Sequence, residues 1–148
     1  MTVLTLCAVL LTGCGPSPQP EQSTTSAPST SASPTPTGPV LVPDGTAADN
    51  LPLFASVMNA VAATDARAQG RAYIDALVAA GFPKDAMEVT HDLTSVGNPA
   101  DSIQFSVRWD DECIVGQVGP STPAPTALVL PLTPAGMCLV GLTRPIDW

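Results

Sequence analysis

The sequence predicts an α+β fold: two N-terminal helices packed on one face of a four- or five-stranded antiparallel sheet, preceded by a disordered linker. The first half of the folded part repeats its apolar residues at helical spacing, whereas from residue 87 onward they alternate with polar residues, as in strands. All the aromatic residues, two Trp, one Tyr and three Phe, lie beyond residue 45. These observations predict one globular domain over residues 45–148, long enough to bury a single core.

The first helix is expected to start at a polar cap, Asp49 or Asn50, and to tolerate Pro52 in its first turn. An apolar residue recurs on one side of this helix at each turn, which predicts a face packed in the core. The residues of this stripe are Leu53, Phe54, Val57, Met58 and Val61.

A second helix is expected to begin near Thr64 or Asp65. Gly81 stands where a left-handed residue commonly ends a helix, and Pro83 prevents continuation. The apolar stripe of this helix is Tyr73, Ile74, Leu77 and Val78.

Five short segments predict strands by their period of two: residues 87–93, 102–109, 113–118, 128–132 and 137–142. The second of these alternates most clearly, so one of its faces is apolar and the other polar. The apolar face carries Ile103, Phe105, Val107 and Trp109, and the polar face carries Ser102, Gln104, Ser106 and Arg108.

The N-terminal residues 1–13 are typical of an export signal. Residues 3–11 are mostly apolar, but a spanning helix needs about 20 such residues, so this stretch predicts a removable signal peptide.

The tetrapeptide Leu11-Thr12-Gly13-Cys14 resembles the lipobox of bacterial lipoproteins. The resemblance implies that Cys14 carries a diacylglycerol thioether and anchors the chain, with its fatty acids such as palmitate, on the extracytoplasmic face of the cell membrane. Because only two residues precede the apolar stretch, we expect the true start codon upstream of Met1.

Residues 14–44 are expected to form a disordered linker. Between residues 15 and 39 there are 7 Pro, 6 Ser and 5 Thr, and a single charged residue, Glu21. Such a segment has too little apolar surface to offset the entropy of ordering, so it predicts polyproline II and coil. The alternative use of its Ser and Thr residues is as acceptors for O-linked sugars.

The charge balance and the absence of known motifs argue against several classes of function. With 13 Asp+Glu against 5 Lys+Arg, the net charge of −8 argues against a nucleic-acid partner. The sequence has no phosphate-binding glycine loop and no His-Glu-x-x-His motif, so we expect no cofactor and no metal. The acidic run Asp110-Asp111-Glu112 could hold calcium loosely, but it lacks the spaced ligands of a calcium loop and predicts a solvated turn.

The cysteines predict a cross-link in the folded domain. Cys7 would leave with the signal peptide and Cys14 would be acylated, so Cys113 and Cys138 remain as an even pair in an oxidising compartment. A structural disulfide is expected. The alternatives are a metal site or a redox pair, which the absence of Cys-x-x-Cys spacing and the single His disfavour.

Two candidate sites follow from the strand pattern. Gln104, Ser106 and Arg108, with Gln117 on the next strand, predict a polar sheet face able to bind a peptide, a sugar or an anionic group. His91 alternates with Met87, Val89 and Leu93, which favours a core or sheet-edge position. The alternative interpretation pairs His91 with Asp92, or with Ser95 or Ser106 as a nucleophile.

Four segments resemble a known family: Ser-Val-Arg-Trp at 106–109, Gly-Gln-Val-Gly at 116–119, the end of the chain at 143–148 and the helical segment 71–82. Over about residues 48–148 they resemble an uncharacterised family of actinobacterial lipoproteins, a domain of unknown function. The resemblance implies a cell-surface lipoprotein of a high-GC Gram-positive bacterium and transfers no catalytic residue.

The expected function is therefore that of a membrane-anchored extracytoplasmic binding or interaction module. Its partners would be the membrane, through lipidated Cys14, and a cell-wall component or another surface protein. The alternative is a small hydrolase-like enzyme that uses His91 or a carboxylate, although the pattern supplies no convergent polar pocket of the kind that acid–base catalysis needs.

Overall fold

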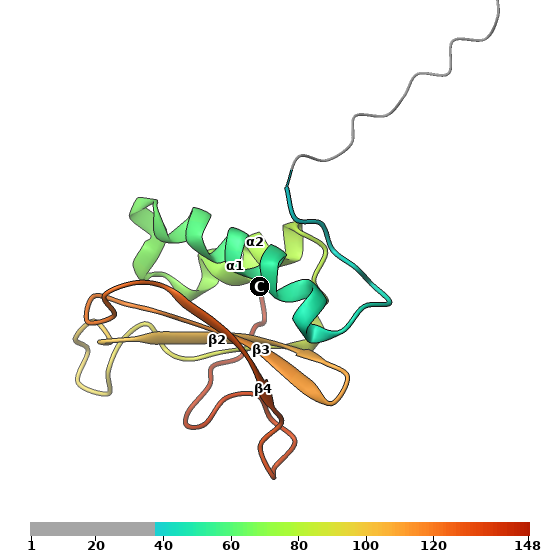
Figure 1. Cartoon of the computed structure of the whole chain (residues 1–148). Helices are drawn as coiled ribbons and strands as arrows, with labels where there is room; N and C mark the ends of the chain where they lie inside the picture. Colours follow the sequence, from blue (N-terminus) through green and yellow to red (C-terminus); the bar gives the residue numbers. More distant parts are fainter. Residues whose placement is uncertain (1–37) are drawn as a thin grey trace, which may run out of the picture. The chain divides into compact units, whose positions relative to one another are not determined.

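The structure, a computed structural model, describes residues 38–148. The predicted signal peptide, Cys14 and the linker up to residue 37 lie outside these described residues. Two helices, α1 (Ala47–Ala62) and α2 (Gly70–Ala79), pack on one face of a four-stranded antiparallel sheet with the order β1-β2-β3-β4 (Figure 1). The predicted fold class is confirmed. The strands are β1 (Met87–Val89), β2 (Ile103–Trp109), β3 (Glu112–Val118) and β4 (Thr126–Pro131), and the short 3₁₀ helices are η1 (Asp65–Ala68) and η2 (Lys84–Ala86).

Helix α1 begins three residues earlier than predicted, because Thr46 is its cap. The Thr46 hydroxyl accepts a hydrogen bond from the Asp49 amide at 3.2 Å, and the Asp49 carboxylate accepts one from the Thr46 amide at 2.8 Å. This reciprocal capping box lowers the pKa of Asp49 through the hydrogen bonds to its carboxylate. The prediction of Asp49 or Asn50 as the cap was therefore wrong, and Pro52 lies inside the helix.

Asn50 is buried and ties the preceding chain to α1. Its side-chain amide donates to the Val42 carbonyl at 2.9 Å, and its oxygen accepts from the Val42 amide at 2.8 Å. Leu41 packs against the core beside this contact. The ordered chain thus extends into the last residues of the segment 14–44.

Helix α2 begins at Gly70, later than predicted, because the chain first forms the separate turn η1 capped by Thr64. Gly70 lies tightly against its neighbours: a Cβ there would come within 2.8 Å of Val89 Cγ2 and 2.9 Å of Asp92 Oδ1. The absence of a side chain lets the start of α2 approach β1 and the loop after it.

The predicted end of the second helix is confirmed. Gly81 has a φ of 100°, and its amide donates to the Val78 carbonyl at 3.0 Å. The Phe82 amide donates to the Leu77 carbonyl at 3.1 Å, which completes the double hydrogen bond of a Schellman cap. The buried Phe82 then enters the core beside Phe54.

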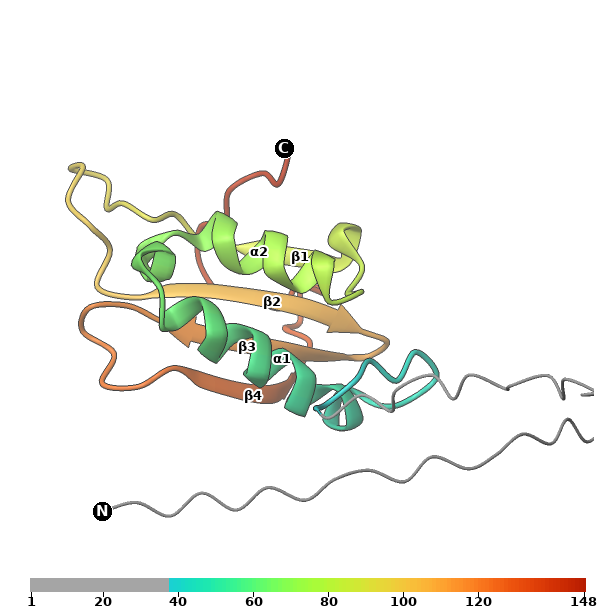
Figure 2. The same ribbon diagram turned by 90° about the horizontal axis from the view of Figure 1, so that it is seen from above.

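The core lies between the helices and the sheet, with α1 over β3 and β4 and α2 over β1 and β2 (Figure 2). At its centre the Phe105 ring stacks on Tyr73, with centroids 4.5 Å apart, and on Phe54, at 5.6 Å. Gly116 is the neighbour of Phe105 on β3, and a Cβ there would lie 2.6 Å from the Phe105 ring. Glycine at this position gives Phe105 the room to contact both helices.

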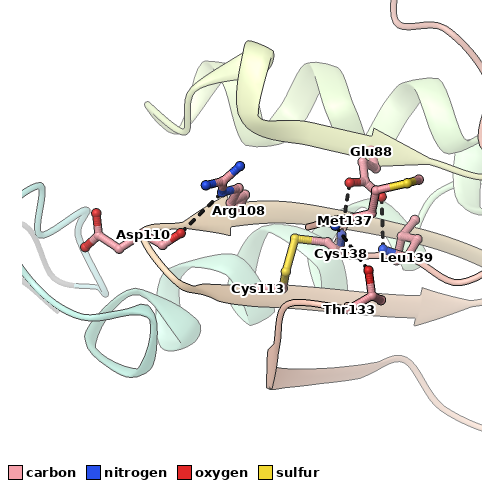
Figure 3. Close-up of a disulfide and its surroundings, with 8 residues drawn as sticks. All are labelled: Glu88, Arg108, Asp110, Cys113, Thr133, Met137, Cys138 and Leu139. Carbon is pink, nitrogen blue, oxygen red and sulfur yellow. Dashed lines mark hydrogen bonds between the residues drawn. A yellow bond between two sulfur atoms is a disulfide. The ribbon is translucent and has the colours of Figure 1, made fainter. Parts of the chain in front are cut away.

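The segment after β4 crosses the opposite face of the sheet and is fixed there (Figure 3). The predicted disulfide joins Cys138 of this segment to Cys113 of β3, with Cα atoms 5.5 Å apart. The Glu88 carboxylate of β1 accepts hydrogen bonds from the amides of Cys138, at 3.0 Å, and Leu139, at 2.9 Å. The predicted fifth strand at 137–142 is therefore wrong, because these two amides bond to a side chain instead of to a strand.

The chain then continues along the outer edge of β1 and ends beside α2. The Arg144 amide donates to the Val89 carbonyl at 2.9 Å. The Trp148 ring lies 5.2 Å from the Arg71 guanidinium and 5.0 Å from that of Arg144. Its indole N–H donates to Asp75 at 2.8 Å, and this hydrogen bond is the main reason why the pKa of Asp75 is lowered. Among residues 38–148 no helix has the length and apolar character to cross a membrane.

We expect the Cys113→Ala/Cys138→Ala double variant to unfold at a lower urea concentration than the oxidised parent. The two residues are separated by 25 positions, and freeing a loop of this length costs about 3 to 4 kcal/mol in the chain-entropy treatment. Equilibrium urea unfolding followed by tryptophan fluorescence measures the difference. An unchanged midpoint would show that the cross-link contributes nothing to stability.

Candidate functional site

The predicted polar face is present on the side of the sheet opposite the helices, but its four residues are not equivalent. Gln104 and Gln117 are directly paired across β2 and β3, and their amide groups are hydrogen-bonded at 3.4 Å. Arg108 lies toward the other end of β2, is exposed, and donates to the Asp110 carbonyl at 3.3 Å. Ser106 is fully buried. The structure thus joins the two glutamines and separates them from Arg108.

Ser106 is the neighbour of Glu88 on β1 and Val115 on β3. Glu88 is the residue whose carboxylate holds the segment around Cys138 against this face. The Ser106 hydroxyl is enclosed without a hydrogen-bond partner among the described residues. This residue cannot meet a ligand while the segment is in place, so the accessible part of the predicted face is its glutamine end.

A pocket of about 480 Å³ opens at this end. Its polar wall is formed by Thr90, His91, Thr94, Ser95, Ser102 and Gln104, and its apolar wall by Leu93 and Leu142. Both leucines are exposed, by 56% and 85%, so they can contact a ligand directly. Within residues 38–148, the side chains of His91, Ser95 and Ser102 make no hydrogen bonds, which leaves an imidazole and two hydroxyls free to bind.

His91 is exposed in this pocket, so the expected core position is wrong; it lies just beyond the end of the edge strand β1. Strand β1 ends at Val89. At the next residue the Gln104 amide donates to the Thr90 hydroxyl at 3.0 Å, where a continuing ladder would use a main-chain carbonyl. The strand pairing therefore ends at Thr90 although the alternation of the sequence continues to Leu93, and His91 lies in the loop.

The Asp92 carboxylate does not bond to His91; it connects the start of α2 to the C-terminal segment. One of its oxygens accepts from the Gly70 amide at the start of α2, at 2.8 Å, and the other pairs with Arg144 at 3.2 Å. Both oxygens are therefore engaged elsewhere, so the hypothesised His91–Asp92 pair is not formed. Ser106 is buried, whereas Ser95 lines the same pocket as His91.

Asp110 and Asp111 of the acidic run form the turn between β2 and β3, and Glu112 begins β3. Asp110 has a φ of 52°, a left-handed conformation that Asp tolerates well, and all three carboxylates are exposed. Within residues 38–148 no group of three or more His, Cys, Asp or Glu side chains is placed to hold a metal ion. The chemistry that the pocket offers is hydrogen bonding through hydroxyls, an amide and an imidazole.

A family model described as "Domain of unknown function (DUF6993)" matches residues 58–142. The chain belongs to this family. The DUF6993 segment runs from the second half of α1 to the segment that crosses the sheet, so it contains the disulfide and every residue that lines the pocket. The family description assigns no activity. Comparisons with curated proteins and with solved structures give no match.

Sequence reasoning missed Thr90, Thr94 and Leu142 as residues of the pocket in the DUF6993 segment. A signal for Leu142 was nevertheless present. Alternate residues of a strand share a face, so Cys113 and Gln117 lie on the same face of β3. A disulfide from Cys113 to Cys138 therefore places the residues that follow Cys138 near that face. Thr90 had no comparable signal, because its role depends on a contact with Gln104, 14 residues away.

We expect Ser106→Ala to raise the free energy of unfolding by about 1 kcal/mol, because it removes a buried hydroxyl that has no partner. The exposed Ser95→Ala is the control and should change stability by less than about 0.5 kcal/mol. Equilibrium urea unfolding measures both variants. A Ser106→Ala chain less stable than the parent would show that the hydroxyl has a partner after all.

Proposed function

We propose that this chain is a lipid-anchored binding module that displays its DUF6993 domain on the extracytoplasmic face of an actinobacterial cell membrane. Support for the anchor comes from the sequence: Cys14 follows a short apolar stretch and a Leu-Thr-Gly tripeptide. The Pro-, Ser- and Thr-rich segment that follows suits a spacer between the membrane and the domain. The disulfide is compatible with an oxidising compartment.

The ligand that we propose is a neutral, amide-bearing sugar of the cell wall. The observation that carries this proposal is the pocket beside Gln104, whose volume of about 480 Å³ lies in the range of small-molecule sites. The pocket presents hydroxyls, a side-chain amide and an imidazole, and no Lys, Arg, Asp or Glu lines it. Leu93 and Leu142 can contact the apolar face of a sugar ring or an acetyl methyl group.

The overall charge favours a neutral ligand over an anionic polymer. With a net charge of −8, the chain repels polyanions at long range, and the pocket contains no Lys or Arg to compensate. An acetamido group suits the site because its N–H and C=O match the donor and acceptor of a glutamine side chain.

The second candidate is a hydrolase-like activity, which is favoured by the fact that His91 and Ser95 line one pocket. No carboxylate in the lining is available to orient the imidazole, whereas nucleophilic triads hold the base with a third group. We therefore place binding before catalysis. The two functions differ in whether the bound sugar is recovered intact.

We expect Cys14→Ala to release the full chain from membranes of an actinobacterial host, because the acyl chains would supply the anchor. Cys7→Ala is the matched control and should remain bound, since Cys7 lies in the signal stretch. Phase separation in detergent and the intact mass of the protein measure the outcome. Persistence of both membrane binding and the lipid mass in Cys14→Ala would contradict the anchor.

For the pocket, we expect a tetramer of N-acetylglucosamine to shift the imidazole NMR signals of His91. The chain has one histidine, so these signals report the site without ambiguity. The full chain carrying Cys14→Ala is used, so that no detergent is present. Gln104→Ala should weaken the response about tenfold, whereas Gln69→Ala, an exposed glutamine outside the pocket, should not.

A glucose tetramer, which lacks the amides, should give a much smaller shift. No response to the acetylated sugar, or an equal response in Gln104→Ala, would contradict the proposed ligand. Mass spectrometry of the recovered sugar distinguishes the two candidate functions: an intact tetramer supports binding, and cleavage that is lost in Ser95→Ala supports the hydrolase.

A further inference from the structure

A second pocket, of about 520 Å³, lies where α1 ends and β2 begins, between η1 and the loop after β3. Its walls are mainly apolar. They are formed by four prolines, Pro99, Pro120, Pro123 and Pro125, together with Ile103 and Val118 of the sheet. The volume falls within the range of about 300–1,000 Å³ in which proteins bind small molecules.

Most of the polar groups in this pocket are already engaged. The Tyr73 hydroxyl donates to the Arg67 carbonyl at 2.9 Å. Asp92 is held by the Gly70 amide and by Arg144. Within residues 38–148 the Arg67 guanidinium and the Thr122 hydroxyl make no hydrogen bond or ion pair, so they remain available to a ligand.

Arg67 and Tyr73 both line the pocket, and the Arg67 charge acts on the Tyr73 hydroxyl. Burial raises the pKa of the Tyr73 hydroxyl, and the positive charge of Arg67 opposes that shift. The tyrosine therefore stays neutral and adds no negative charge to the site. Arg67 is the one cationic residue in the lining, and the one carboxylate there, Asp92, is neutralised by Arg144.

We infer that this pocket binds a small aliphatic monocarboxylate, with its carboxylate on Arg67 and its hydrocarbon body between the proline-rich loop and the sheet. A guanidinium forms two parallel hydrogen bonds with a carboxylate, and apolar walls favour a hydrocarbon chain. A ligand with several negative charges does not suit this site. Arg67 is the only cation in the lining that could balance them, and the net charge of the chain is negative. This site is separate from the pocket of His91 and does not depend on the sugar proposal.

The test is calorimetric titration of the full chain with octanoate, with Cys14→Ala present so that no detergent competes for the probe. Arg67→Gln should weaken octanoate binding at least about tenfold, because it removes the charge that faces the carboxylate. Arg71→Gln is the matched control: Arg71 is exposed, pairs with Asp75 and lies outside the pocket, so binding should be unchanged. Octanol, which has the same chain without the charge, should bind more weakly than octanoate.

A second pair of variants tests the hydrocarbon part of the site. Ala68→Phe places a ring in the pocket and should abolish binding, whereas Ala63→Phe, exposed and outside the lining, should not. Absence of octanoate binding to the parent at millimolar concentration would overturn the inference. So would equal affinities in Arg67→Gln and Arg71→Gln, an equal affinity for octanol, or full binding by a folded Ala68→Phe.

Discussion

The attachment of the C-terminal segment to the sheet is the contact on which the far face of the sheet and the polar pocket depend. Two helices cover one face of the sheet, and the opposite face is left to the chain that follows β4. The Cys113–Cys138 bridge and the Glu88 carboxylate fix that chain over Ser106. From there the chain supplies Leu142 to one pocket and Arg144 to the ion pair with Asp92.

Asp92 connects this attachment to the two pockets. It lies in the loop after β1, bonds to the start of α2 and to Arg144, and faces the apolar pocket. Its neighbours His91 and Leu93 face the polar pocket on the other side of the loop. A single loop thus separates two sites of different chemistry. One is neutral and rich in hydroxyls, and the other is apolar with one free guanidinium.

The sequence was a good guide to most features whose cause is local, although it missed the Thr46 cap that begins α1. Gly81 and Pro83 end the second helix as predicted, and the alternation of residues 102–109 predicts β2 to within one residue.

The sequence prediction failed where the structure depends on a contact between residues that are far apart in the chain. The amides near Cys138 bond to Glu88, 50 positions away, and no strand forms there. His91 leaves the sheet because Thr90 uses its side chain to bond to Gln104. Both pockets depend on such distant contacts, so the pattern yielded individual residues of the polar pocket but neither pocket as a whole.

The distribution of positive charge sharpens what each site can recognise. Of the 5 Lys and Arg residues in the chain, Arg71, Lys84 and Arg144 surround the Trp148 ring, where they hold the end of the chain against α2. Arg108 is bonded to the turn that follows it. Arg67 alone among these cations lines a pocket. The acidic surplus of the chain supports both proposals: an uncharged ligand for the polar pocket, and a ligand with a single carboxylate for the apolar pocket.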